Sequence, residues 1–470
     1  MKKILSIIFF LLLIFSSYSF SDDKSIIKKL DGLNFPVQII KNEQISNNSI
    51  FVLEHRPGAI IEIENFFDQN SEKKINKILD LSSIITDVDS WEQGVQSFAF
   101  SPNFSNDNLV FVSYNNKNNQ LVLSSFQYEH SSRTIPISTE EVILKIDRIF
   151  DKSLTKNEHT CGTIKFHPID NFLYLCTGDA RSPELSQDFQ SLNGKILRID
   201  PFTLNKDENK KYKSPEKNPY IKIDGRPEIV FAGLRNPWAF SFDLDTGDAF
   251  IPDIGSEYIE ELNIVSYSEF DSLLNFGWGC YEGTYRIYDK HYEEALNSSK
   301  PCKENLNNKL LKFKEPSLQY FHDSLFNTYS KYGNSIIGGV LYKNENSIWH
   351  NHYFFGDLVS SNIWYLDMNN PKQKGINFIS GENLDIGLTS ITQIDDKILA
   401  TSFMGSIYEI LLPESKDLEK YLYGRPTVNK DLDVIKFMND NDQIVFTSGS
   451  KFYYMLKKFI KYYPIFKSFS

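Results

Sequence analysis

One pattern recurs six times along this 470-residue chain, and it restricts the fold more than any other feature. In each copy a short apolar strand is followed by a polar turn, a second apolar strand and then a small or acidic residue. The turns are rich in Asn, Asp, Pro and Gly, which are the residues that tight hairpins favour. The six copies begin at Pro36, Gln96, Gly162, Trp238, Gly338 and Ser390.

Six such hairpins predict an all-β chain, a six-bladed β-propeller built of four-stranded antiparallel blades. Each hairpin would gain two more strands, of which the apolar runs after Gln120 and Ile196 are examples. An aromatic content of 14% and the scarcity of helical periodicity agree with this. Closing a ring also removes the long edges that an open sheet exposes. A two-sheet sandwich is the alternative, but six hairpins are too many for one.

The amino-terminal residues read as a secretory signal peptide. Two lysines precede an apolar run at residues 4–15, and small polar residues lead to a cleavage point before Asp22. The run is too short for a bilayer span of about 20 residues. An uncleaved anchor is the alternative. Both place the remainder of the chain outside the cytoplasm, so we expect a periplasmic or secreted protein.

Charge separates the last residues from the rest of the chain. The net charge of −11 and the pI of about 5.4 argue against nucleic acid as a partner. Residues 451–470, in contrast, carry five lysines and no acid among Phe, Tyr and Ile. Such a segment could contact a membrane surface or a partner, or form a final strand. We divide the chain into a signal peptide (1–21), a propeller (22–412) and an extension of unknown role (413–470).

Four cysteines in an exported chain permit disulfides. Cys280 and Cys302 bracket one loop. Cys161 and Cys176 lie near the open ends of one predicted hairpin, where cross-strand neighbours come close enough to bond. We predict both pairs.

The propeller geometry brings distant polar residues together. Loops that enter first strands and loops that leave second strands lie on the same face. We therefore expect Glu92, His159 and Arg235, which precede first strands, to cluster with Asp179 and Asp253, which follow second strands. An acid, a base and a cation would then meet at one central opening, where ligands commonly bind.

These residue types suit proton and carbonyl chemistry. A neutral His159 can take a proton from a hydroxyl, and Asp179 can hold its other ring nitrogen. Arg235 can contact a carbonyl or carboxylate of a ligand. The plainer alternatives are a structural histidine and an arginine that ties down its own loop.

A calcium site is a further hypothesis. The backbone carbonyls of Gly255 and Ser256, with Asp253, Glu260 or Glu261 nearby, offer the oxygen ligands that calcium prefers. A solvated acidic loop is the alternative. The sequence has no nucleotide-binding glycine loop, zinc spacing or nucleophile elbow. Hydride chemistry would therefore need another kind of cofactor.

Several stretches together resemble one family, the soluble quinone-dependent aldose sugar (glucose/sorbosone) dehydrogenases. They also resemble the propeller of Hedgehog-interacting-type proteins. The similarity runs from about Phe35 to Ile410. The stretches are EQGVQSFAFSPNFSNDNLVFVSY, NEHTCGTIKFHPIDNFLYLCTGDA with LNGKILRIDP, RPEIVFAGLRNPWAFSFDLDTGDAFIPDIGSEYIEELNIV, NFGWGCYEGT and YFFGDLVSSNIWYL.

The resemblance implies a six-bladed propeller that binds pyrroloquinoline quinone and calcium and oxidises the C1 hydroxyl of aldose sugars. His159 would take the proton of that hydroxyl while the C1 hydride passes to the quinone, and Asp179 would hold His159. Arg235 would polarise the accepting carbonyl, with Asn236 beside it. Glu92 would line the cofactor site.

The same resemblance implies two calcium sites. The carbonyls of Gly255 and Ser256 would hold calcium against the quinone. Glu261 and the Phe276 carbonyl would form a second, structural site.

The chain departs from the family pattern at several positions. Gln96 and Ser97 replace a Leu-Gly pair, and Cys161 replaces a glycine. Enzymatic members also carry a lysine in the fifth blade and an Arg-x-Arg in the sixth, which grip the carboxylates of the quinone. The matching stretches here, GDLVSSNIW and GENLDIGLTSITQ, contain no basic residue.

Unpaired buried carboxylates are costly, so these departures leave more than one function open. Arg286, in the insertion at 275–334, is a candidate substitute cation. The first hypothesis is a quinoprotein dehydrogenase with a small sugar as its substrate. The second is a non-catalytic, calcium-binding propeller that serves as a binding or scaffold protein. A lactonase-like hydrolase is a third, but it would need several carboxylates and amides in the central channel.

Overall fold

The computed structural model describes most of the predicted propeller. The described residues are 26–86, 92–148, 158–206, 208–256, 259–286, 304–305, 307–322, 333–369, 377–380 and 387–412. The predicted signal peptide, the extension at 413–470 and Cys302 lie outside them. The described part contains no helix that is long and apolar enough to cross a membrane.

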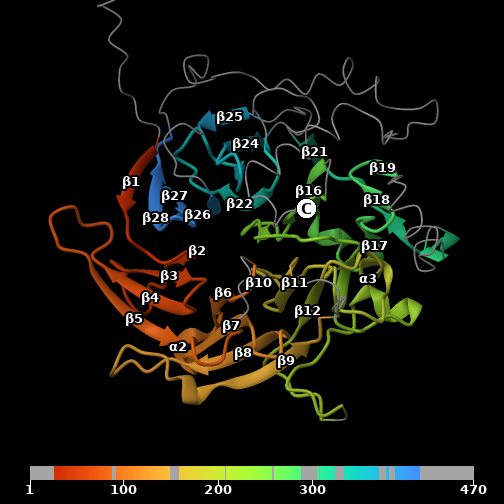
Figure 1. The fold of residues 1–470 in the computed structure, drawn as a ribbon, viewed down its shortest axis with the longest axis horizontal. Coiled ribbons are helices and arrows are strands. Elements are labelled where there is room, and N and C mark those ends of the chain that lie inside the picture. The colour runs from red at the N-terminus through yellow and green to blue at the C-terminus, as the bar shows by residue number, and fades with distance from the viewer. Residues whose placement is uncertain are drawn as a thin grey trace, which may run out of the picture.

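Small, mainly antiparallel sheets form a ring, which is the arrangement of a β-propeller (Figure 1). The first sheet contains β2 (Pro36–Ile40), β3 (Ile50–Glu54), β4 (Ala59–Glu64) and β5 (Lys74–Asp80). The second contains β6 (Val95–Phe100), β7 (Leu109–Asn115), β8 (Leu121–Gln127) and β9 (Glu141–Ile146). The third contains β10 (Cys161–Phe166), β11 (Leu173–Thr177), β12 (Lys195–Ile199), β13 (Ile229–Ala232), β17 (Leu274–Asn275) and β20 (Lys312–Phe313).

Three more sheets complete the ring. The fourth contains β14 (Ser241–Phe242), β15 (Ala249–Asp253), β16 (Ile259–Val265) and β21 (Leu318–Phe321). The fifth contains β22 (Ile336–Tyr342), β23 (His352–Asp357), β24 (Ile363–Asp367) and β25 (Asn377–Ser380). The last contains β26 (Leu388–Ile394), β27 (Lys397–Ser402), β28 (Ser406–Ile410) and β1 (Ile26–Leu30).

The remaining elements are short. A two-stranded hairpin joins β18 (Tyr281–Glu282) and β19 (Tyr285–Arg286). Within the described residues, the α-helices are α2 (Phe104–Asp107) and α3 (Pro183–Gln187). The 3₁₀ helices are η1 (Ile137–Thr139), η2 (Pro219–Ile223) and η3 (Tyr267–Glu269).

All six predicted hairpins are present as antiparallel pairs, each made of the first two strands of a sheet. Five of the sheets have the predicted four-stranded form, whereas the third has six strands. Its two additional strands, β17 and β20, come from the predicted insertion and pair in parallel beyond β13. They cover a backbone edge that would otherwise stay unpaired.

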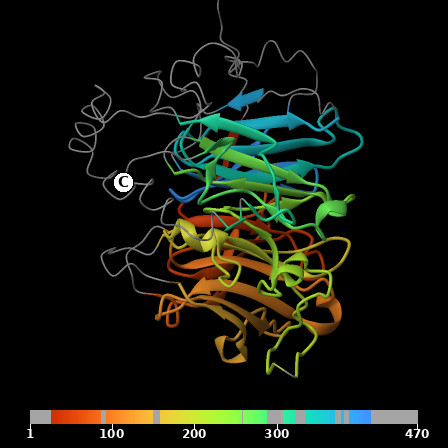
Figure 2. The ribbon, with the colours of Figure 1, turned by 90° about the vertical axis from the view of Figure 1, so that its right-hand side faces the viewer.

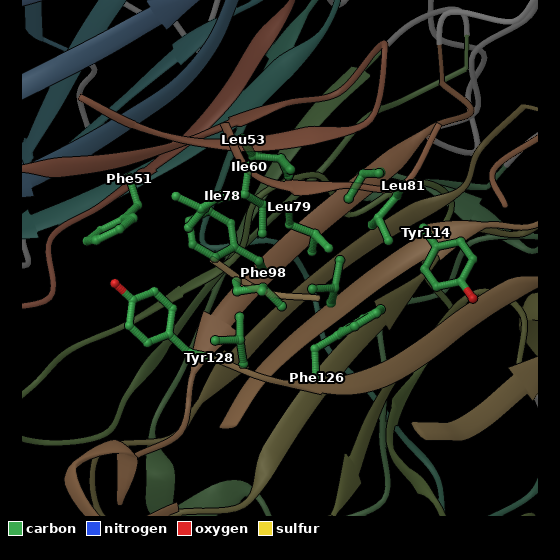
Figure 3. Packing of buried hydrophobic residues seen from close by; sticks show 14 of the residues in the cluster. Phe51, Leu53, Ile60, Ile78, Leu79, Leu81, Phe98, Tyr114, Phe126 and Tyr128 are labelled. Carbon is green, nitrogen blue, oxygen red and sulfur yellow. The ribbon is translucent and has the colours of Figure 1, made fainter. Parts of the chain in front are cut away.

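The ring closes through its two ends. β1 pairs with β28, with Ile26 opposite Ile410, so an amino-terminal strand completes the last sheet. Large apolar side chains fill the spaces between neighbouring sheets, as the packing of Phe51 and Ile60 near Phe98 and Phe126 shows (Figure 3). Burying one such side chain stabilises the fold by roughly 1.5–3 kcal/mol.

Connections between strands divide into two faces. The loops before first strands and after second strands lie on one side, which we call the site face. The turns after first strands and the connections after third strands lie on the other, the opposite face. A hydrogen bond from Leu33 to Gly405 joins two loops of the site face. Many strands run across the side view of the ring (Figure 2).

The predicted pair Cys161–Cys176 is a disulfide, with Cα atoms 5.9 Å apart across β10 and β11. The other predicted pair, Cys280–Cys302, stays a prediction because Cys302 lies outside the described residues.

Candidate functional site

His159 and Asp179 meet on the site face, although 20 positions separate them. His159 lies just before β10 and Asp179 just after β11. The His159 Nδ1 atom lies 2.6 Å from an oxygen of the Asp179 carboxylate. Because a carboxylate accepts, Nδ1 carries the proton and Nε2 keeps its lone pair. Arg235 donates to that Nε2 from 2.9 Å. The sequence predicted that these three residues would cluster.

The Asp179 carboxylate is fully buried and well supplied with donors. Trp278 Nε1 donates to it at 2.7 Å and the Arg181 N–H at 2.8 Å. Burial by itself would raise the pKa of Asp179, but the neighbouring His159 and Arg235 and the Trp278 hydrogen bond outweigh it. The pKa of Asp179 therefore lies below its ordinary value, and the carboxylate stays charged beside the imidazole.

Arg235 is held from three sides. Its backbone N–H donates to the Asp253 carboxylate at 2.8 Å, and its guanidinium donates to the Ile254 carbonyl at 3.0 Å. The guanidinium carbon lies 5.5 Å from the centre of the Trp278 ring, in cation–π range. Arg235 Nε is buried without a hydrogen-bond partner in the described structure. One donor of this side chain is thus left over for an acceptor.

Asn236 and Glu92 extend the cluster towards the second sheet. The Asn236 N–H donates to Asp253 at 2.7 Å, and its side chain lies 3.4 Å from Glu92 Oε2. The same Glu92 oxygen accepts the N–H of Thr160 at 3.2 Å. The Asn236 Oδ1 atom is buried without a partner among the described residues. Glu92 and Arg235 therefore belong to one cluster, as the propeller geometry predicted, and Asn236 lies with them, next to Arg235, as the resemblance implied.

Acidic residues gather behind Arg235. Asp253 and Glu261 lie opposite each other in the β15–β16 register. Burial raises the pKa of Glu261 to about 7, and burial together with the charge of Glu261 raises the pKa of Asp253. Glu260, next in sequence, is 2.6 Å from His322 Nε2 and accepts the N–H of Ile336.

The predicted calcium turn follows β15. The N–H of Gly255 donates to Glu260 at 3.3 Å, and that of Ser256 donates to Glu282 at 2.8 Å. A Cβ at Gly255 would overlap the Ile259 carbonyl, so only glycine fits this turn. Within the described ranges, no three His, Cys, Asp or Glu side chains are arranged to hold a metal ion.

Phe276, the other predicted ligand, follows β17, where its N–H donates to Ala232. The calcium-binding roles of Gly255, Ser256, Glu261 and Phe276 stay predictions.

Two departures from the family pattern are structurally connected. Cys161 has φ +53°, in the left-handed region that glycine adopts freely and other residues adopt at a cost. A Cβ on the next residue, Gly162, would overlap the side chain of Gln96. Gln96 in turn donates to Asn115 Oδ1 and to the Glu92 carbonyl, both at 2.6 Å. A polar side chain thus supports Glu92 where the family has leucine.

Sequence reasoning missed three residues of this site. Trp278 lies in the NFGWGCYEGT stretch and Lys195 in LNGKILRIDP, so the family resemblance was the signal for both. Lys195 is buried, donates to the carbonyls of Leu185, Ser186 and Asn193, and has its pKa lowered by burial to about 7.

Arg148, the third, had no signal in the sequence. Its guanidinium donates to the carbonyls of Glu158 and His159 at 2.9 and 2.6 Å. Burial lowers its pKa to about 10. This cation fixes the loop that carries His159.

The fifth and last sheets contribute different groups to the site face. Their described stretches at 356–364 and 387–393 contain no lysine or arginine. The described ionisable side chain there is Asp357, which is fully buried. The side chain of Arg286, the predicted substitute cation, lies outside the described part of the structure.

The ring of sheets defines a class of protein, the β-propellers. The chain belongs to the glucose/sorbosone dehydrogenase family, whose model matches residues 35–384. It is 31% identical to the HIPL2 protein of Arabidopsis thaliana over 260 residues, which cover 52% of this chain and 35% of that protein. It is 27% identical to the Hedgehog-interacting protein of Homo sapiens over 168 residues, covering 33% and 23%. The chain thus spans about a third or less of the length of these relatives.

Among solved structures, the PQQ-bound form of aldose sugar dehydrogenase from Streptomyces coelicolor superposes with a TM-score of 0.57. The match covers 82% of this chain and 96% of that chain at 18% identity. At this identity the similarity establishes the propeller fold alone.

Proposed function

We propose that this chain is a secreted or periplasmic oxidoreductase that oxidises the C1 hydroxyl of an aldose sugar, with pyrroloquinoline quinone and calcium as cofactors. One observation carries the proposal. His159 presents a lone pair at Nε2, while Asp179 and Trp278 fix the ring from the other side. This is the arrangement of a positioned general base.

The residues present fit the reacting end of this cofactor, because Arg235 Nε and Asn236 Oδ1 are buried polar atoms that still lack partners in the described residues. A planar ligand rich in carbonyl and N–H groups would satisfy both. Arg235 and Asn236 would hold the quinone, and the carbonyls of Gly255 and Ser256 would hold calcium. The quinone, when bound, supplies a hydride acceptor.

The residues of the chain handle the proton. The Nε2 atom of His159 has one lone pair, and in this structure Arg235 occupies it. When a sugar hydroxyl takes that position, the guanidinium must turn away and can donate to another acceptor. His159 then accepts the hydroxyl proton at Nε2 while Asp179 keeps Nδ1 protonated. The negative charge of Asp179 stabilises the imidazolium that results.

We also propose that the ring has six blades, with the six-stranded sheet counted as one blade that has gained β17 and β20. The order of strands supports this count, because each sheet contains one of the six hairpins.

A second candidate is a non-catalytic propeller that binds a protein partner. The stretches at 356–364 and 387–393, which lack cations, favour it. The similarity to a protein named for its interaction with Hedgehog points the same way.

Reconstitution separates the two candidates. The mature chain is mixed with calcium and quinone, and reduction of a dye is followed with a panel of aldoses. We expect sugar-dependent reduction that falls by about 10²–10⁴-fold in His159→Ala, the usual contribution of a general base. His130→Ala is the matched control, since His130 is exposed on the opposite face and bonds only to Asn108 among the contacts seen. A folded protein without saturable quinone binding would reject the dehydrogenase and leave the binding propeller.

A further inference from the structure

The opposite face displays most of the large apolar side chains that the structure exposes. Of twelve such side chains in the described residues, eight lie on connections of that face, whereas one, Met404, lies on the site face. Seven of the eight lie on connections of the third to the last sheets. They are Ile169, Phe202, Leu204, Ile221, Leu244, Ile348 and Leu411. Exposed apolar side chains that gather on one face indicate an interaction surface.

The turns between first and second strands form a ring around this face, and three of them carry one of these residues: Ile169, Leu244 and Ile348. His167 on the third sheet contacts the Gly247 carbonyl on the fourth at 2.9 Å. Lys343 on the fifth sheet pairs with Asp243 and Asp245 on the fourth, both at 2.9 Å. Lys41 on the first sheet pairs with Asp395 on the last at 2.7 Å. Neighbouring sheets are thus joined at three places on this ring.

The same ring is acidic. We define the acidic turn ring as the six turns between first and second strands, residues 41–49, 101–108, 167–172, 243–248, 343–351 and 395–396. These turns contain nine carboxylates and two lysines. Both lysines are already paired within the ring. The acidic turn ring thus combines the exposed side chains of Ile169, Leu244 and Ile348 with excess negative charge, and it fits a partner that is both apolar and basic.

The chain itself carries a segment of that chemistry and delivers it to this face. Ile410, at the end of β28, pairs with Ile398 at the start of β27, so the chain leaves the last sheet on the opposite face. Fifty-eight residues follow Leu412. The final twenty, 451–470, contain five lysines, eight aromatic residues and no acid. The 38 residues between can span more than about 100 Å when extended, enough to reach any turn.

We infer that residues 451–470 bind in cis to the acidic turn ring, with their aromatic side chains on the exposed apolar residues and their lysines beside the carboxylates. Tethering favours this partner, because a linked segment is present at an effective concentration in the millimolar range. The inference does not depend on the proposed enzymatic activity.

Zero-length carbodiimide cross-linking of the full chain, read by mass spectrometry, tests the inference. Lysines of 451–470 should link to carboxylates of the ring such as Asp245 and Glu345. In a mixture of isotopically light and heavy protein, the links should join residues of the same copy. The double variant Leu244→Ser and Ile348→Ser should lower their yield by about tenfold, because two apolar contacts are lost. Both side chains are exposed, so the fold should persist, as circular dichroism would check.

Met404→Ser is the matched control, because it removes an exposed apolar side chain of the site face and should leave the links unchanged. In the wild-type chain the yield of links should be higher at low salt than at high salt, because salt screens charge attraction. In a second variant, with Lys457, Lys458 and Lys461 each replaced by Gln, this difference should disappear. Light–heavy links as the main product would overturn the inference in favour of a second copy. Co-sedimentation with phosphatidylserine vesicles and loss of the links would overturn it in favour of a membrane. Links spread evenly over both faces, or no links, would overturn it outright.

Discussion

The two halves of the site face differ in how they treat charge. In the third and fourth sheets, His159, Asp179 and Arg235 form one network of short contacts, and Trp278 closes it. In the fifth and last sheets, the described stretches facing the site offer no cation and one buried acid, Asp357. The groups to which the proposed function assigns the hydroxyl proton therefore lie together, while the described stretches of the fifth and last sheets supply no cation for an anionic ligand.

The largest effect is expected from Asp179→Asn, which tests the network of His159, Asp179 and Arg235. An amide oxygen cannot stabilise an imidazolium as a carboxylate does, and it can hold the wrong tautomer of His159. We expect the dye-reduction rate of the reconstituted protein to fall by about 10³-fold. Asp245→Asn, on the opposite face, is the control and should keep full rate. An Asp179 variant with undiminished activity would mean that the network is structural.

The stability of the protein should depend on pH through Asp357, which lies in the half of the site face formed by the fifth and last sheets. Burial raises the pKa of Asp357 to about 7, from an ordinary value near 3.8, and the charge of Glu260 adds to this. The folded state thus holds a proton that the unfolded state releases, so stability is greatest below about pH 4 with respect to this group. It falls as pH rises through 7, by up to about 4 kcal/mol.

Thermal unfolding between pH 5 and 8 measures this effect. Asp357→Asn should flatten the decline, and the slope that remains should include Glu261, whose pKa burial also raises. A melting temperature that rises over this range in the wild type but not in Asp357→Asn would contradict the raised pKa of Asp357.

A cation added to the fifth sheet should strengthen the binding of an anionic ligand at the site face. Val359 lies in the turn between β23 and β24, where enzymatic relatives are expected to carry lysine. Val359→Lys should tighten quinone binding by about tenfold, as one new charge pair with a carboxylate would. Val359→Gln, similar in length but neutral, should not. Equal affinity in both variants would show that the anchoring group lies elsewhere.

The smallest effect is expected from Trp278→Phe. The phenyl ring keeps a face for the Arg235 guanidinium, but the hydrogen bond to Asp179 is lost. One such bond is worth about 1 kcal/mol, so the rate should fall about fivefold. The pH–rate profile should also shift, because that bond helps to lower the pKa of Asp179. An unchanged profile would assign Trp278 to packing alone.

The sequence predicted the parts of this molecule that depend on local pattern. The six hairpins were visible because each is a contiguous alternation of strand and turn. The meeting of His159 with Asp179 and of Arg235 with Asp253 followed from where those residues lie relative to strand ends. The contact of Trp278 with Asp179 spans 99 positions and leaves no periodic signal. The pairing of β17 and β20 beyond β13 is equally remote from local pattern, as is the placement of Arg148.

The closure of the ring through β1 and β28 has a consequence for the order of folding. The partners Ile26 and Ile410 lie 384 positions apart, so this pairing carries the largest loop-closure entropy of the ladders in the described residues. A chain made from its amino terminus holds β1 without its partner until β28 exists. The other described sheets pair strands that are closer in sequence. We therefore expect the two ends to join last, and a chain cut before Ser406 to leave β1 and β27 with unpaired edges.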